Sequence, residues 1–165
     1  MILYTFLKNT DLHAISAFDV LSHLMGYSSL ISLKRYQKWD LGRADKMEVE
    51  PILSTTYLLL NLNKEFYTTT PPSIANDGSK KTFRLEAISP HVDAQAILKK
   101  IQNRFSNTVE TLSHTVIWDL TVCSELAIAD LQEDIMKKLV LTVSFRQGLL
   151  INPLLETATL TYIPS

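Results

Sequence analysis

A segment rich in turn formers and poor in apolar residues divides this 165-residue chain almost in half. It covers residues 70–81 and contains two prolines, a glycine, an asparagine and an aspartate among polar neighbours. Such a composition favours a linker over a helix or a strand. We therefore expect one repeat over residues 1–70, a linker over residues 71–81 and a second repeat over residues 82–165.

Each half opens with the pattern of a strand followed by a helix. Residues 2–8 and 82–88 mix aromatic and aliphatic residues with polar ones, as strands do. In the first half the helix has Asp11 as a candidate N-cap, and Gly26 stands where a helix often ends. In the second half Pro90 is expected in the first helical turn, which tolerates proline. The apolar stripe of this second helix consists of Ala94, Ile97, Ile101 and Phe105.

A Trp-Asp-Leu tripeptide recurs after each predicted helix and marks a second strand. The two copies begin at Trp39 and Trp118, which are 79 positions apart. The same offset aligns Tyr4 with Phe83 in the opening strands. Large rings on a strand most often pack against the rest of the sheet, so we expect both tryptophans to be core residues, with an interface anchor as the alternative.

The last part of the second half has the pattern of a helix and then a strand. Apolar residues keep helical phase over residues 128–150, and Asn152-Pro153 is expected to end this long helix. A closing strand follows, with Ala158 and Leu160 on one face and threonines on the other.

The first half contains a shorter version of the same pattern. Pro51 is expected in the opening turn of the helix, residues 58–61 at its end, and residues 66–68 in a brief strand. Each half therefore predicts the order β-α-β-β-α-β, the ferredoxin-like order. We expect an α+β protein in which two such repeats form a pseudo-dimer of antiparallel sheets with the helices outside.

The charge balance argues against two classes of partner. The chain contains 16 Lys+Arg and 17 Asp+Glu, with a net charge of −1, so no global field attracts nucleic acid or an anionic membrane. A single cysteine, Cys123, allows no internal disulfide and favours a reducing compartment. We find no apolar run of the length of a signal core or a membrane span. We therefore expect a soluble cytoplasmic protein.

The sequence contains no recognisable catalytic or cofactor motif. Its glycines are scattered singly, which excludes a P-loop and a dinucleotide fingerprint, and its histidines lack metal-ligand spacing. We expect Cys123 to be a buried, inert thiol at a strand end. An acidic group at the start of the last helix is expected to complement the helix dipole; it consists of Glu125, Asp130, Glu133 and Asp134. We predict no catalytic, cofactor-binding or metal-binding residue.

A basic run at residues 34–39 mixes positive charge with aromatic rings, as single-strand binders do. Because there is no second basic patch, we favour the exposed crest of a hairpin or a partner contact. Asn152-Pro153 by itself indicates only a helix-to-strand turn. The candidate partner-interface residues are Lys34, Arg35, Tyr36, Lys38, Asn152 and Pro153.

Several short motifs together resemble a known family. Residues 14–18 resemble "ALSAF", residues 24–27 resemble "LGY", residues 87–90 resemble "TISP", and residues 149–156 resemble "LLANPVIE", with a fainter echo at residues 58–61. In this order they resemble the PurS subunit of phosphoribosylformylglycinamidine (FGAM) synthase, present twice, and equally the N-terminal PurS-like domain of the large single-chain form of that enzyme. PurS usually carries "VRxGK" where residues 33–38 here lack the glycine.

The resemblance implies an accessory, non-catalytic subunit of a ligase complex. In that family a PurL synthetase amidates formylglycinamide ribonucleotide with ATP and Mg, a PurQ glutaminase supplies ammonia from glutamine, and PurS bridges the two. No cofactor is expected on this chain itself. A duplicated chain would replace the PurS dimer by a covalent pseudo-dimer, which raises the effective concentration of the two modules and leaves further homo-association open.

Two other classes share the predicted order of elements. A tandem ACT-type regulatory module binds small effectors between paired domains, and a thermal shift on adding amino acids or nucleotides would identify it. An RRM-like RNA binder needs aromatic rings on a basic sheet face, which the balanced charge disfavours.

Overall fold

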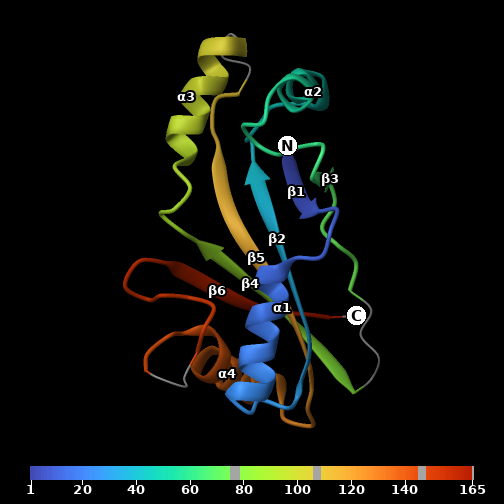
Figure 1. Ribbon diagram of the computed structural model, residues 1–165, viewed down its shortest axis with the longest axis vertical. Coiled ribbons are helices and arrows are strands. Elements are labelled where there is room, and N and C mark those ends of the chain that lie inside the picture. The colour runs from blue at the N-terminus through green and yellow to red at the C-terminus, as the bar shows by residue number, and fades with distance from the viewer. Residues whose placement is uncertain (75–78, 106–108, 145–147, 165) are drawn as a thin grey trace. The chain divides into compact units, whose positions relative to one another are not determined.

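The computed structural model describes residues 1–74, 79–105, 109–144 and 148–164. Over these residues the chain is an α+β protein with one six-stranded sheet in the order β3-β1-β2-β5-β4-β6 (Figure 1). The strands are β1 Ile2–Leu7, β2 Leu30–Asp40, β3 Glu65–Thr68, β4 Lys80–Ile88, β5 Ser113–Cys123 and β6 Thr157–Ile163. The helices are α1 Leu12–Asp19, α2 Lys46–Thr55, α3 Ala94–Phe105 and α4 Ile128–Ile135, and the π-helical turns η1 Val20–Leu24 and η2 Met136–Val140 continue α1 and α4. Part of the predicted linker, residues 75–78, lies outside the described residues.

The chain forms two compact units, and each takes segments from both halves of the sequence. Unit 1 consists of Met1–Thr10, Tyr36–Pro72 and Pro90–Val116, and unit 2 of Asp11–Arg35, Ser73–Ser89 and Ile117–Ser165. Unit 1 therefore holds β1, α2 and β3 of the first half together with α3 of the second. Unit 2 holds β4, α4 and β6 of the second half together with α1 of the first, while β2 and β5 each contribute to both units. The repeat boundaries at residues 70 and 82 stay a prediction about the sequence.

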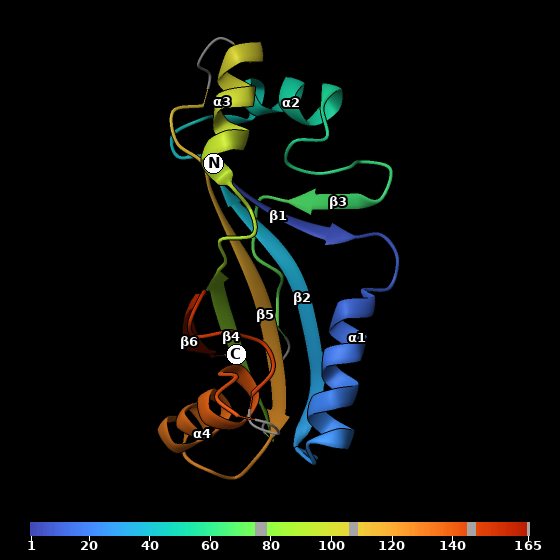
Figure 2. The same ribbon diagram turned by 60° about the vertical axis from the view of Figure 1, so that its left-hand side comes forward.

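In unit 1, α2 and α3 lie at the same end of the sheet (Figure 2). They share one hydrophobic core with β1 and β2. Asp45 begins α2 with a capping box, in which Asp45 Oδ1 accepts from the Glu48 amide at 2.9 Å and Glu48 Oε2 accepts from the Asp45 amide at 2.8 Å. Pro51 therefore lies inside α2, and the expectation that it occupies the opening turn is wrong. The shared core contains Leu3, Trp39, Val49, Ile52, Leu53, Leu98 and Ile101, none more than 6% exposed.

In unit 2, α4 contacts β6, and the core residues Phe83, Leu85, Leu120, Leu131 and Ile135 are at most 1% exposed. The prediction of one helix over residues 128–150 is wrong, because helical structure ends at Val140 and Leu141 is extended. From Gly148 onward the chain returns to the end of this helix, and its backbone amides satisfy the last helical carbonyls. The amides of Gly148, Leu149 and Ile151 donate to the carbonyls of Lys138, Leu139 and Val140 at 2.9–3.0 Å.

The predicted start of the first helix is confirmed in the first half of the sequence. In the second half the predicted start is wrong. Asp11 is the N-cap of α1, and its Oδ1 accepts from the Ala14 amide at 3.2 Å. In α3 the corresponding carboxylate is Asp93, whose Oδ1 accepts from the Ala96 amide at 2.9 Å, so Pro90 lies upstream of the helix. The two aspartates stand 82 positions apart.

Other predictions are confirmed. The apolar stripe over residues 94–105 matches the bounds of α3, and Gly26 has the left-handed φ of 75° expected at a helix end. Trp39 and Trp118 are 3% and 8% exposed, so both pack inside the sheet. In β6 the three threonines are exposed and Leu160 is buried, as the alternation predicted.

Candidate partner-binding surface

The basic run lies within β2 and not at the crest of a hairpin, so that expectation is wrong. Side chains of a strand alternate between its two faces, which sends Lys34, Tyr36 and Lys38 to one face and Arg35 to the other. Lys34 is exposed, whereas Arg35 and Lys38 are half-buried. The run therefore does not present its charges together on one surface.

Tyr36 packs in a row of aromatic rings in unit 1. It is 3% exposed, with ring centroids 5.0 Å from Phe6 in a stacked arrangement and 6.2 Å from Tyr4 in an edge-on one. Phe6 stacks in turn on Phe66 at 5.0 Å, and Phe66 is 45% exposed. Aromatic pairs at these separations stabilise a fold beyond their buried area. Tyr36 thus packs within the chain, and exposure to solvent increases along the row through Phe6 to Phe66.

Arg35 is held by contacts inside unit 2. Its guanidinium lies 3.5 Å from Asp11 Oδ2 and 5.7 Å from the centroid of the Trp118 ring. Asp11 is also the N-cap of α1, so this ion pair ties the start of α1 to β2. The position of Arg35 is therefore explained by the fold.

Asn152 and Pro153 lie in an exposed turn fixed by four hydrogen bonds. The Asn152 amide donates to Glu156 Oε2 at 2.9 Å, and Asn152 Oδ1 accepts from the Leu154 amide at 3.0 Å. The Asn152 carbonyl accepts from the amides of Leu155 and Glu156 at 3.0 and 2.8 Å. This turn holds Leu154 and Leu155 in solvent at 89% and 57% exposure. Two apolar side chains on a fixed turn are suited to anchoring a partner.

A turn with the same four hydrogen bonds precedes β3 in unit 1. The Asn61 amide donates to Glu65 Oε2 at 2.7 Å, and Asn61 Oδ1 accepts from the Asn63 amide at 3.0 Å. The Asn61 carbonyl accepts from the amides of Lys64 and Glu65 at 2.8 and 2.7 Å. This second turn carries polar Asn63 and Lys64 where unit 2 carries two leucines. The pattern Asn-x-x-x-Glu, with Glu65 and Glu156 as its unrecognised members, was readable from the sequence.

The hydrogen-bonded register changes the predicted alignment of the opening strands. Thr68 pairs with Tyr4, and Thr159 pairs with Glu86. Thr68 and Thr159 are 91 positions apart, as are the asparagines of the two turns. Tyr4 therefore corresponds to Glu86 at an offset of 82, which also separates the two capping aspartates. The alignment of Tyr4 with Phe83 at an offset of 79 is wrong.

Two members of the acidic group, Glu133 and Asp134, contact nearby cations and a tyrosine. Lys137 pairs with Glu133 at 2.5 Å and lowers the pKa of that carboxyl by a hydrogen bond, and Lys138 pairs with Asp134 at 2.6 Å. Tyr27 donates its phenol to Asp134 at 2.9 Å, and burial together with this bond raises the pKa of Tyr27 to about 12.

Cys123 is exposed at the end of β5, so the prediction of a buried thiol is wrong. Among the residues that the structure describes, no group of three His, Cys, Asp or Glu side chains is placed to hold a metal ion. Nor does any helix in the described ranges have the length and apolar character needed to cross a membrane. Comparisons with protein-family models, curated proteins and solved structures found no match.

Proposed function

We propose that this chain is a PurS-type subunit of FGAM synthase, in which two ferredoxin-like repeats form a covalent pseudo-dimer. It bridges a PurL-type synthetase and a PurQ-type glutaminase in the cytoplasm. The assembled complex converts formylglycinamide ribonucleotide to FGAM with ATP, Mg and glutamine, and this chain contributes contacts to its partners without taking part in the chemistry.

The paired Asn-x-x-x-Glu turns carry this proposal. They coincide with the two places where the sequence resembles the closing motif of PurS, at residues 58–61 and 149–156. In both turns the asparagine and glutamate make the same backbone hydrogen bonds and lead into a closing strand antiparallel to the opening strand of the same half. The two turns agree in their hydrogen bonds as well as in their residue types, which supports a duplicated module.

The composition of the two units supports the pseudo-dimer. Each unit combines the opening strand, second helix and closing strand of one half with the first helix of the other half. This is the arrangement that two identical chains adopt when they exchange an element, and a linker between the copies makes the exchange intramolecular.

We assign the main partner contact to the Asn152–Glu156 turn, because Leu154 and Leu155 are the exposed apolar residues nearest to the predicted interface residues Asn152 and Pro153. The exposed side chain of Lys34, within β2, contributes positive charge. Tyr36 is only 3% exposed, which is too little for a partner contact, so we remove Tyr36 from the proposed interface.

The test is reconstitution with a synthetase and a glutaminase of the same organism. We expect the three proteins to co-purify. Glutamine-dependent FGAM formation should require this chain, whereas the rate of ammonia-dependent FGAM formation by the synthetase should depend on it less strongly. Full glutamine-dependent activity of the other two proteins without this chain would overturn the proposal.

A matched pair of variants locates the contact. Leu154→Ser combined with Leu155→Ser is expected to abolish co-purification without changing the melting temperature, because both side chains are mostly in solvent. Met47→Ser is the control, since Met47 is 85% exposed on α2 and outside the turn. Equal loss of binding in the control would contradict the assignment.

A further inference from the structure

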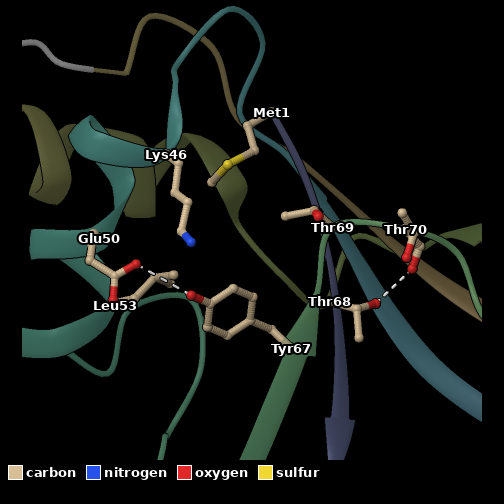
Figure 3. Close-up of a pocket in the computed structure, with 8 residues that line it drawn as sticks. All are labelled: Met1, Lys46, Glu50, Leu53, Tyr67, Thr68, Thr69 and Thr70. Carbon is tan, nitrogen blue, oxygen red and sulfur yellow. Dashed lines mark hydrogen bonds between the residues drawn. The ribbon is translucent and has the colours of Figure 1, made fainter.

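Unit 1 contains a pocket of about 370 Å³ between α2 and the end of β3 (Figure 3). Leu53 forms part of its apolar lining, and Lys46, Glu50, Tyr67, Thr69 and Thr70 supply polar groups. This volume is at the lower end of the range of small-molecule sites, about 300–1,000 Å³. The pocket is thus of a size suited to a metabolite with few heavy atoms.

The pocket exists because the closing strand of unit 1 is short. β3 ends at Thr68, whose hydroxyl donates to the Thr70 carbonyl at 2.6 Å where the chain turns away. In unit 2 the strand β6 continues to Ile163, and Gln132 of α4 donates to the Leu160 carbonyl at 2.9 Å. Gln132 follows Glu50 by the same 82 positions that separate the capping aspartates. The side chain of Glu50 therefore faces an open space, whereas its counterpart Gln132 binds the closing strand β6.

Two opposite charges face this space without pairing with each other. Lys46 and Glu50 are spaced i,i+4 on α2, the separation at which such residues form ion pairs. Within the described ranges the Lys46 ammonium makes neither an ion pair nor a hydrogen bond, and Figure 3 shows it directed into the pocket. Among the described residues, the Glu50 carboxylate accepts only a long hydrogen bond, 3.4 Å, from the Tyr67 phenol. Each charge thus retains capacity to bind a ligand.

We propose that this pocket binds a zwitterionic α-amino acid, with the ligand carboxylate on Lys46 and the ligand ammonium on Glu50. A simple anion would meet the Glu50 carboxylate, and a simple cation would meet the Lys46 ammonium, whereas a zwitterion pairs with both. The hydroxyls of Thr69 and Thr70 and the phenol of Tyr67 offer hydrogen bonds to the ligand side chain, which selects for a polar amino acid. This site lies within unit 1 and does not depend on the proposed assembly function.

The site is open to solvent, so the expected dissociation constant is on the order of 1 mM. The test is a titration of the ¹⁵N-labelled full chain, followed by amide chemical shifts, with L-glutamine, L-serine and L-leucine as probes. Acetate, inorganic phosphate and ethylamine are the single-charge controls. We expect saturable shifts over residues 46–53 and 67–70 with glutamine and serine, and weaker binding of leucine and of each control.

Charge variants test the pairing directly. Lys46→Met and Glu50→Gln are each expected to weaken glutamine binding about tenfold, the effect of removing one charge-assisted contact. Lys99→Met, at an exposed position on α3, is the matched control and should bind as the parent does. The double variant with Lys46→Glu and Glu50→Lys should retain binding, because a zwitterion can reverse its orientation. Phosphate or acetate binding as tightly as glutamine, or no saturable shift with any amino acid, would overturn the proposal.

Discussion

The two units use the same turn before their closing strands but fill the neighbouring sheet face differently. In unit 1 that face carries the stacked rings of Phe6, Tyr36 and Phe66. In unit 2 it carries an ion pair in which the Arg84 guanidinium donates twice to Asp119, at 2.8 and 3.0 Å. The side chains of Arg84 and Asp119 are only 13% and 5% exposed. Two units with the same turn therefore differ in the side chains beside it, which are aromatic in unit 1 and charged in unit 2.

The difference matters energetically because buried charges and buried rings respond differently to truncation. Loss of one ring leaves a cavity that neighbours partly fill, whereas loss of one member of an ion pair leaves a buried charge without its partner. Unit 2 thus has a specific buried polar pair in addition to its apolar core, whereas this face of unit 1 is filled by packed rings. Four tests compare the two units, in order of decreasing effect.

The largest effect is expected from Asp119→Ala in unit 2. It removes the carboxylate that accepts two hydrogen bonds from the largely buried Arg84 guanidinium and should lower the free energy of unfolding by about 3–5 kcal/mol, as chemical denaturation would show. Replacing both partners, with Arg84→Met and Asp119→Leu, should recover most of the loss because no buried charge remains. An Asp119→Ala protein as stable as the parent would show that the pair is not needed.

The helix ends of the two units provide the next test. Gly148 has a φ of 69°, and a Cβ there would overlap the Leu141 backbone carbonyl, so Gly148→Ala should cost about 3 kcal/mol of unfolding free energy. In unit 1 the end of α2 is closed by the Thr56 hydroxyl, which donates to the Ile52 carbonyl at 2.7 Å. Thr56→Val removes that bond together with the longer one, 3.3 Å, that the hydroxyl accepts from the Leu58 amide, and should cost about 1–2 kcal/mol. Thermal unfolding of both variants measures these losses. A larger loss of stability in Thr56→Val than in Gly148→Ala would contradict the comparison.

The two Asn-x-x-x-Glu turns should respond alike. Asn61→Ala and Asn152→Ala each remove one side-chain acceptor from the same position of the turn, and each should lower the unfolding free energy by about 1 kcal/mol. Denaturant midpoints measured side by side give the comparison. A loss of about 1 kcal/mol in one variant and none in the other would show that the two turns are not equivalent.

The smallest effect is expected from alkaline pH. Burial and the contact with Asp134 raise the pKa of Tyr27 to about 12 in unit 2, and burial and Glu50 raise the pKa of Tyr67 in unit 1. A raised pKa favours the neutral phenol in the folded chain, so the stability that Tyr27 contributes is complete below pH 10 and is lost between pH 10 and 12. Tyr27→Phe should flatten this decline in unfolding free energy more than Tyr67→Phe does. An unchanged decline in both variants would assign it to other groups.

Local patterns in the sequence predicted much of the fold. The spacing of apolar residues, a pattern that is local in the sequence, predicted three strands and one helix. These are the strands around residues 2–7, 80–88 and 157–163 and the helix at residues 94–105. The end of the helix at Val140 was mispredicted because it depends on amides that return from Gly148 onward, which spacing does not encode. The 79-residue offset failed for the same reason, since strand register is set by pairing between distant residues.

The solvent exposure of the candidate interface residues was predicted less well than the fold. Asn152 and Pro153 do lie in an exposed turn, as a turn motif suggests. Tyr36 is buried because Phe6, thirty positions earlier in sequence, stacks on it from the adjacent strand. Composition shows that a basic run mixes charge with rings, but strand alternation and contacts between strands decide which of those side chains reach solvent.

The central proposal, two copies of one module that complete each other with their first helices, is tested most directly by expressing residues 1–74 and 79–165 separately. We predict that neither half is a folded monomer in sedimentation and circular dichroism, and that an equimolar mixture regains a cooperative unfolding transition. A half that sediments as a monomer and unfolds cooperatively alone would contradict the proposal.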